Sequence, residues 1–231
     1  MRYLLTLSLL CSFFIAANTY AATTSEIYFV RHAETLGNVT HQHNRKNDRT
    51  LSRQGLQQVK QLTAKLGRLR SDAPFDAIIV SPKYRTLITI LPFLKKYQLQ
   101  AEIWPELQEC CWQEKSSRLS STTLQRGKMI NLEPDMRRYF TFPNAEAHRK
   151  YASKNYGDGL LQTFKAAQLV RKRFAHSAKR ILIVGHYHSG ARLIEILQGI
   201  EPDGRYKLSN AKISHLKENS DGSFQLIDLN Q

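Results

Sequence analysis

Short apolar segments that alternate with helical periodicities constrain the fold of this chain most strongly. Residues 26–30 (EIYFV), 76–80 (DAIIV) and 180–184 (RILIV) are mostly apolar and five residues long. Runs of this length and composition are typical of strands that are buried on both faces. Because helical patterns such as the one over 52–69 separate them, the sequence predicts an α/β fold with a mostly parallel sheet.

Capping and turn residues place the remaining elements. We expect Ser52 to cap the helix over 52–69, and Ser81 to cap a helix that has Pro82 at its first position and that Pro92 bends or ends. The other expected elements are a strand over 101–104, helices over 159–175 and 188–198, and antiparallel tail strands over 211–217 and 223–229.

The first residues predict a signal peptide over 1–22 and a domain over 23–231. Arg2 precedes an apolar run over 3–17, and the small residues Ala21 and Ala22 follow it as cleavage positions. The run is shorter than the ~20 residues that span a bilayer, so we expect export to the periplasm or the medium, with no stable membrane insertion after cleavage. An uncleaved membrane anchor is the alternative.

The domain keeps only two cysteines, Cys110 and Cys111. A disulfide prefers Cα atoms about 5.5 Å apart, whereas a trans peptide holds neighbouring Cα atoms at about 3.8 Å. We therefore expect no pairing between them, and no metal site, because no further ligand has the matching spacing.

The net charge of +15 predicts an anionic partner. Phosphorylated small molecules, nucleic acid, polyphosphate and acidic lipids all satisfy this requirement, so charge alone does not choose between them. Residues 113–157 have weak periodicity and many basic side chains, and we expect an insertion of irregular structure and short helices there.

Reactive residues follow each of the three apolar strands. Arg31 and His32 follow the first, Ser81 and then Arg85 the second, and His186 the third. One histidine after a strand is more often a packed residue than a catalytic one. In a parallel sheet, however, the carboxyl ends of neighbouring strands meet at one edge, where ligands bind, so these residues are expected to converge.

Two arginines and two histidines suit phosphoryl transfer. Arginine matches phosphate oxygens in a bidentate fashion, and a neutral imidazole can attack phosphorus and hold the phosphoryl group covalently. We expect the second histidine, His186, to be protonated and to donate to the same oxygens. An alcohol leaving group also needs a proton, for which Glu109 is the candidate.

Several motifs resemble those of the histidine phosphatase superfamily, also called the phosphoglycerate mutase-like family. The run FVRHAETLGN resembles its Arg-His-Gly-Glu-Thr opening, with Ala33 in place of the glycine. The runs LSRQGLQQ, VSPKYRTLIT, PELQE and VGH resemble its later motifs in the same order, over about residues 26–200. The resemblance implies a three-layer α/β/α sandwich, and a chemistry that needs no metal or cofactor.

The resemblance also implies residue roles. His32 would be the nucleophile and Glu109 the proton donor. The implied phosphate-binding residues are Arg31, Asn38, Arg85 and His186, and the accessory residues are Thr35, which orients the loop, and His188.

This sequence departs from the family pattern in places. The run CCWQEK after Glu109 makes Glu114 a competing proton donor. His188 follows the late motif and either touches the substrate or packs, and we favour packing. His41 and His43 form a His-x-His pair, which we interpret as part of a solvated loop rather than a metal site.

We therefore expect an exported phosphatase that hydrolyses phosphate monoesters through a phosphohistidine. The alternatives are a phosphoglycerate mutase-like phosphotransferase and a catalytically silent protein that binds phosphorylated ligands. The partner is a small phosphorylated substrate, with no specific nucleic acid. The basic insertion over 113–157 favours a polyanionic substrate, unless it is only a solvated lid.

Overall fold

The structure, a computed structural model, describes residues 24–112 and 126–231. The predicted signal peptide over 1–22 and the competing acid Glu114 lie outside the described residues. Among the helices within residues 24–112 and 126–231, none has the combined length and apolar character of a membrane span.

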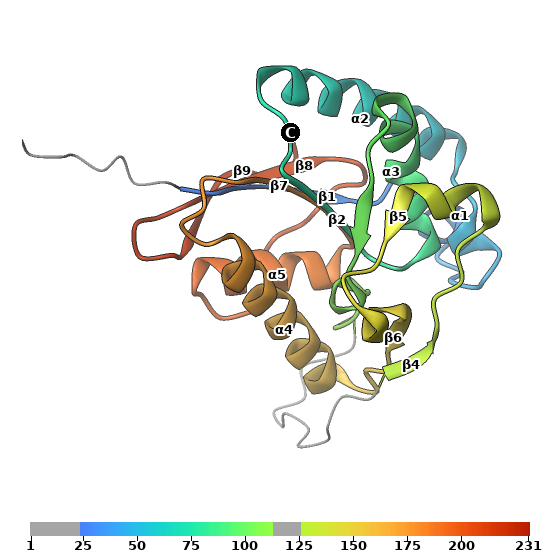
Figure 1. The fold of residues 1–231 in the computed structure, drawn as a ribbon. Coiled ribbons are helices and arrows are strands. Elements are labelled where there is room, and N and C mark those ends of the chain that lie inside the picture. The colour runs from blue at the N-terminus through green and yellow to red at the C-terminus, as the bar shows by residue number, and fades with distance from the viewer. Residues whose placement is uncertain (1–23, 113–125) are drawn as a thin grey trace, which may run out of the picture.

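A seven-stranded, mostly parallel sheet forms the middle layer (Figure 1). In spatial order its strands are β5 (Phe140–Thr141), β3 (Ala101–Ile103), β2 (Ala77–Val80), β7 (Arg180–Gly185), β1 (Glu26–Arg31), β8 (Ile213–Glu218) and β9 (Phe224–Asp228). The first five are parallel to one another, and β8 pairs antiparallel with both β1 and β9. The predicted tail strands are confirmed.

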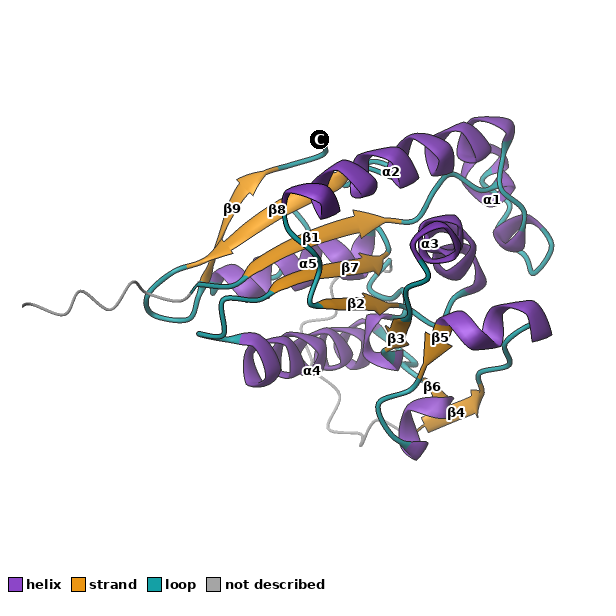
Figure 2. Ribbon diagram, turned by 45° about the horizontal axis from the view of Figure 1, so that its top comes forward, coloured by secondary structure: helices purple, strands orange, loops and turns teal. Residues whose placement is uncertain are grey.

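Helices cover both faces of this sheet (Figure 2). The helices α2 (Arg53–Asp72) and α3 (Tyr84–Tyr97) lie on one face, and α4 (Tyr156–Phe174) and α5 (His188–Gln198) on the other. Successive strand residues point to opposite faces, so Val30 packs with the α2–α3 core and Phe29 with the α4–α5 core. The predicted three-layer α/β/α sandwich is confirmed.

The helix after β2 starts later than expected. It begins at Tyr84, after Lys83 as the N-cap, instead of after Ser81. The Ser81 hydroxyl is instead bonded to the His186 ring, 2.7 Å away, so it is engaged in the site. The helix also continues through Pro92 to Tyr97, so the expectation that Pro92 could end it is wrong.

The basic segment contains more β structure than expected. Beside the short helices η3 (Pro134–Tyr139) and η4 (Ala145–His148), the strands β4 (Arg126–Met129) and β6 (Arg149–Tyr151) form a small antiparallel sheet. Strand β5 adds an edge to the main sheet because Phe140 is buried in the α2–α3 core. Its two residues are too few to give the alternation that predicts a strand.

The structure joins Cys110 and Cys111 in a disulfide between neighbouring residues, contrary to expectation. Their Cα atoms are 3.8 Å apart, as a trans peptide requires, and Cys111 has a left-handed backbone with φ of 66°. Both side chains are buried against Tyr156. The Cα separation alone therefore does not exclude a bridge between neighbouring cysteines, because the left-handed backbone of Cys111 accompanies it here.

Candidate active site

The carboxyl ends of β1, β7 and β2 lie side by side and bring the predicted residues together. Arg31 pairs with Gly185 across β1 and β7, and Val80 with Val184 across β2 and β7. The next residues along each strand are therefore neighbours at one edge of the sheet. Both histidines at this edge are buried, with 2% of His32 and none of His186 exposed.

Hydrogen bonds fix the tautomer of His32. Its Nδ1 lies 2.8 Å from the carbonyl oxygen of Ala33, which can only accept, so Nδ1 carries the proton. Its Nε2 accepts from Arg85 Nε at 3.0 Å. Burial, and then the Arg85 charge, lower the pKa of His32 well below its ordinary value. The ring is therefore neutral near pH 7, and its Nε2 lone pair faces Arg85.

His186 is held in the complementary tautomer. Its Nδ1 accepts from Arg85 Nε at 3.2 Å, and its Nε2 donates to the Ser81 hydroxyl. Burial, and then the Arg85 charge, lower the pKa of His186 well below its ordinary value. The ligand-free site therefore favours the neutral form of His186, and the protonated form expected against phosphate oxygens stays a prediction.

Arg31 approaches the site from β1. Its Nη1 donates to the carbonyl oxygen of Leu208 at 2.8 Å, and the guanidinium lies over the Tyr187 ring, 4.8 Å from its centroid. Its buried Nε has no hydrogen-bond partner among the described residues.

Glu109 is anchored at the N-terminal end of α5. Its carboxylate accepts from the backbone N–H groups of Tyr187 at 3.2 Å and Ser189 at 3.0 Å. These amides belong to the group that a helix leaves without internal partners, where a negative charge is favoured. Arg31 and Arg85 interact electrostatically with the same carboxylate, which places it beside the two arginines.

Thr35 and Asn38 shape the first loop of the site. Thr35 caps α1 (Leu36–Thr40), and its Oγ1 accepts from the Asn38 backbone while Asn38 Oδ1 accepts from the Thr35 backbone. Such a capping box uses the oxygen of Asn38. The Nδ2 donor of Asn38, which would serve a phosphate, has no hydrogen bond within residues 24–112 and 126–231.

The remaining histidines occupy different surroundings. His188 is half-buried, packs edge-on against Tyr187, and interacts electrostatically with Glu109 and Arg31, so it lies at the site. His41 is exposed, as expected of a solvated loop. The His43 ring bonds to Asp48, and no group of three or more metal-binding side chains occurs in the described part of the chain.

Sequence reasoning missed three residues at this site. Tyr187 stacks on Arg31, and Asp48 lies 3.7 Å from Arg85. Lys83 is half-buried, and its ammonium interacts electrostatically with Arg85 and Glu109. The spacing of Lys83 between Ser81 and Arg85 could have pointed to it; nothing in the sequence singled out the other two.

Comparisons with known proteins agree with this geometry. The family model for the histidine phosphatase superfamily (branch 1) matches residues 27–231. Comparison with curated proteins gave no significant match.

Solved structures share the fold at low sequence identity. The alpha-ribazole phosphatase from Shigella flexneri is 20% identical with a TM-score of 0.58, over 89% of this chain and 96% of that one. A phosphoserine phosphatase mutant from Entamoeba histolytica, in complex with phosphoserine, is 16% identical with a TM-score of 0.58, over 90% and 97%. The mycobacterial glucosyl-3-phosphoglycerate phosphatase is 17% identical with a TM-score of 0.58, over 89% and 98%.

The family match over residues 27–231 includes both buried histidines, Arg31, Arg85 and Glu109. The chain is therefore a phosphatase enzyme that belongs to branch 1 of the histidine phosphatase superfamily.

Proposed function

We propose that the protein hydrolyses phosphate monoesters through a covalent intermediate on His32 Nε2. The observation that carries this proposal is the fixed tautomer of His32. The Ala33 carbonyl holds the proton on Nδ1, and the unprotonated Nε2 faces the guanidinium that would bind the phosphate. A buried, neutral imidazole with an oriented lone pair is what in-line attack on phosphorus requires.

In the first step, the Nε2 lone pair forms the bond to phosphorus while the bond from phosphorus to the ester oxygen breaks. Glu109 in its protonated form donates its proton to the departing alcohol oxygen. The Ala33 carbonyl stabilises the positive charge that develops on the ring, because it already accepts from Nδ1. Arg31 and Arg85 stabilise the negative charge on the phosphoryl oxygens.

In the second step, water attacks the phosphohistidine. The Glu109 carboxylate accepts a proton from the water, the new oxygen–phosphorus bond forms, and the nitrogen–phosphorus bond breaks. Inorganic phosphate leaves, with the His32 ring neutral and Glu109 protonated again. A bound phosphate dianion would also offset the Arg85 charge that lowers the pKa of His186, and so favour the protonated form of that ring.

The test is phosphate release by the mature protein from a panel of monoesters, with His32→Ala as the matched variant. We expect turnover by the wild type, and a loss of more than about a hundredfold in the variant with an unchanged fold. Turnover that persists in His32→Ala would contradict the covalent mechanism. Binding without turnover in the wild type would favour a silent binding protein.

The substrates that we propose carry a second anionic group near the phosphate. In support, Lys83 and Lys150 interact electrostatically with each other, and the Lys83 ammonium lies close to Arg85. Among the described residues, the two carboxylates that interact electrostatically with Lys83 are those of Glu109 and Asp48, and both are also bonded to other groups. A second phosphate or a carboxylate would match these two ammonium groups.

This preference is tested with two esters of similar size, glycerol phosphate and 3-phosphoglycerate. In Lys83→Met, kcat/KM should fall about tenfold for phosphoglycerate and little for glycerol phosphate. The control Lys60→Met removes the same charge from an exposed position on α2 and should change neither. Equal losses on both esters would show that Lys83 serves the transferred phosphate itself.

We also propose that the protein is exported, as the sequence over 1–22 predicts. The supporting features are Arg2, the apolar run over 3–17 and the small residues Ala21 and Ala22. Fractionation of cells that express the full chain, followed by N-terminal sequencing, should find a protein that begins at Ala22 or Thr23 outside the cytoplasm. Retention of Met1 on cytoplasmic protein would contradict the proposal.

A further inference from the structure

The loop over 41–50 reaches the phosphate-binding arginine through one side chain. Asp48 Oδ2 lies 3.7 Å from Arg85 Nη1, and Asp48 Oδ1 is bonded to His43 Nδ1 at 2.9 Å. The Arg85 side chain is 13% exposed and that of Asp48 26% exposed, so the pair is partly buried. Asp48 thus uses one oxygen for each of two partners.

Two nitrogen atoms of the Arg85 guanidinium contact different partners. Its Nε is shared between His32 and His186, while its Nη1 faces Asp48. A guanidinium is planar, so a carboxylate that fixes Nη1 also fixes the rotation of the whole group. We propose that Asp48, itself held by His43, is a positioning residue that sets the orientation of Arg85 for phosphate. The proposal rests on the phosphate-binding role of Arg85 proposed above.

Gly37 in α1 makes room for this contact. A Cβ at Gly37 would collide with Asp48 Oδ1 and would lie 3.0 Å from His43 Nδ1. Gly37 has an ordinary helical backbone, so a left-handed conformation does not explain why a glycine stands there. The missing side chain lets the Asp48–His43 pair approach the helix that follows the nucleophile.

The loop is anchored on both sides of Asp48. At its base, Leu36 N donates to the Thr50 carbonyl, and Thr35 forms a bridge with Leu51. At its outer side, Arg49 pairs with Glu133 at 2.7 Å and lies over the Tyr84 ring, 3.7 Å from its centroid.

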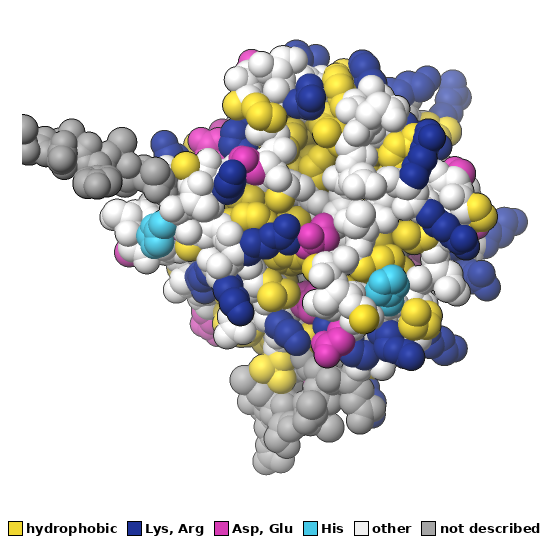
Figure 3. Space-filling view, in the orientation of Figure 1, with side chains coloured by type: hydrophobic (Ala, Val, Ile, Leu, Met, Phe, Trp, Pro, Cys, Tyr) yellow, Lys and Arg dark blue, Asp and Glu magenta, His cyan; other side chains and the backbone are white. Residues whose placement is uncertain are grey.

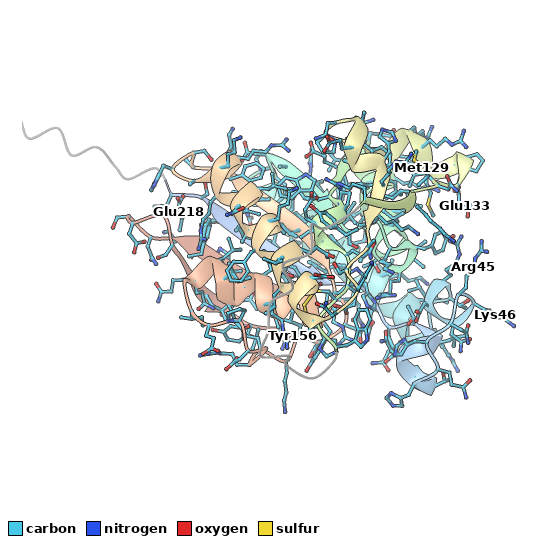
Figure 4. The ribbon with its side chains drawn as sticks, turned by 90° about the horizontal axis from the view of Figure 1, so that it is seen from below. Arg45, Lys46, Met129, Glu133, Tyr156 and Glu218 are labelled. Carbon is cyan, nitrogen blue, oxygen red and sulfur yellow. A yellow bond between two sulfur atoms is a disulfide. The ribbon has the colours of Figure 1, made fainter. Side chains whose placement is uncertain are left out.

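Figure 4 shows Arg45 and Lys46 of the loop on the same side of the molecule as Glu133. Because the loop is held on both sides of Asp48, the position of the Asp48 carboxylate beside Arg85 is well defined.

The direction in which Asp48→Ala changes the affinity for phosphate distinguishes a positioning role of Asp48 from a purely electrostatic one. Removing a negative charge beside Arg85 makes the pocket more positive, which by itself tightens anion binding. Loss of positioning weakens it instead. Asp48→Ala should therefore raise the inhibition constant of inorganic phosphate by about tenfold, and lower kcat/KM by a similar factor.

Gly37→Ala provides the matching variant without a change of charge. It should displace Asp48 and reproduce most of the loss, and the double variant Gly37→Ala/Asp48→Ala should be no worse than Asp48→Ala. His43→Ala should give a smaller loss in the same direction. The controls are Val39→Ala, an exposed residue of α1, and His41→Asn, an exposed loop histidine, which should both behave as the wild type.

Different results would contradict the positioning role of Asp48 and the proposed function. Tighter phosphate binding in Asp48→Ala, or normal activity in a folded Gly37→Ala, would overturn the positioning role while wild-type turnover left the proposed function intact. Failure of the wild type itself to release phosphate would overturn the proposed function. Thermal unfolding of each variant shows whether a loss of activity reflects a loss of fold.

Discussion

At the scale of single residues, the site consists of two buried, neutral histidine rings that both contact the guanidinium of Arg85. Arg85 Nε bonds to both His32 and His186, and the two rings lie 5.3 Å apart between centroids. Each ring presents a lone pair to the arginine, so a proton on either ring would place two cations in contact. This arrangement explains why both histidines are neutral in the free site.

The neutral histidines give a pH dependence with a definite sign. Their pKa values are lowered in the folded protein, whereas in the unfolded chain they are about 6.5, so the unfolded chain binds more protons as the pH falls. Their contribution to stability is present above about pH 6.5 and is lost as the pH falls further.

We expect ring-nitrogen NMR signals of His32 and His186 to remain those of neutral imidazole at about pH 6 in the ligand-free protein. The variant His32→Gln identifies its own signal. A midpoint at or above the ordinary value for either ring would contradict the burial argument.

Glu109 gives a prediction that depends on the leaving group. An alkyl alcohol cannot leave without a proton, whereas a nitrophenolate can, so Glu109→Gln should slow an alkyl phosphate about a hundredfold more than an aryl phosphate. Glu114→Gln is the control, because Glu114 is the competing acid. If Glu109→Gln slowed both esters equally, or if Glu114→Gln slowed only the alkyl ester, Glu109 would not be the proton donor.

At the scale of elements, helix α4 holds the segment that carries Glu109. The buried Gln162 donates from Nε2 to the carbonyl oxygens of Glu106 at 3.0 Å and Gln108 at 2.6 Å. A carbonyl that loses its partner in a buried position costs about 1–3 kcal/mol.

We expect Gln162→Leu to lower the free energy of unfolding by about 2 kcal/mol, and to reduce turnover of alkyl esters more than aryl esters. The exposed Gln168 of the same helix offers the control Gln168→Leu, which should be neutral. Denaturant unfolding and the two-ester assay measure both effects. A destabilised variant with an unchanged alkyl-to-aryl ratio would show that α4 does not support Glu109.

The sequence was informative where structure is local and repetitive. Buried strands and the α2 cap at Ser52 follow from short-range patterns, and both occur as expected. The Asp48–Arg85 contact joins positions 37 residues apart through a loop without periodicity. Tyr187 and the neutral state of His186 depend on burial by distant elements, which no local pattern encodes.

At the scale of the whole molecule, positive charge dominates the surface. Lysine and arginine outnumber aspartate and glutamate by 34 to 19, and in Figure 3 basic side chains are spread over the visible face. Arg137 and Arg138 of η3 are exposed members of this set. Such a field attracts multiply charged substrates, and salt screens it over a Debye length of about 8 Å at physiological ionic strength.

We expect added salt to lower kcat/KM more steeply for a doubly anionic ester than for a singly anionic one. Replacing both Arg137 and Arg138 with serine should reduce that difference if the segment over 126–151 guides substrates. Identical salt slopes for the two esters in the wild type would show that the surface charge does not select substrates.

In the proposed mechanism, His32 carries the phosphoryl group during turnover. The most direct measurement is rapid acid-free quenching of the enzyme with a phosphate monoester, followed by peptide mass spectrometry. We expect an acid-labile, base-stable phosphate on His32 Nε2 that is absent from His32→Ala. It should increase in Glu109→Gln with an aryl ester, because hydrolysis of the intermediate then lacks its base. Turnover with no phosphorylated His32, or with phosphate on another residue, would contradict this mechanism.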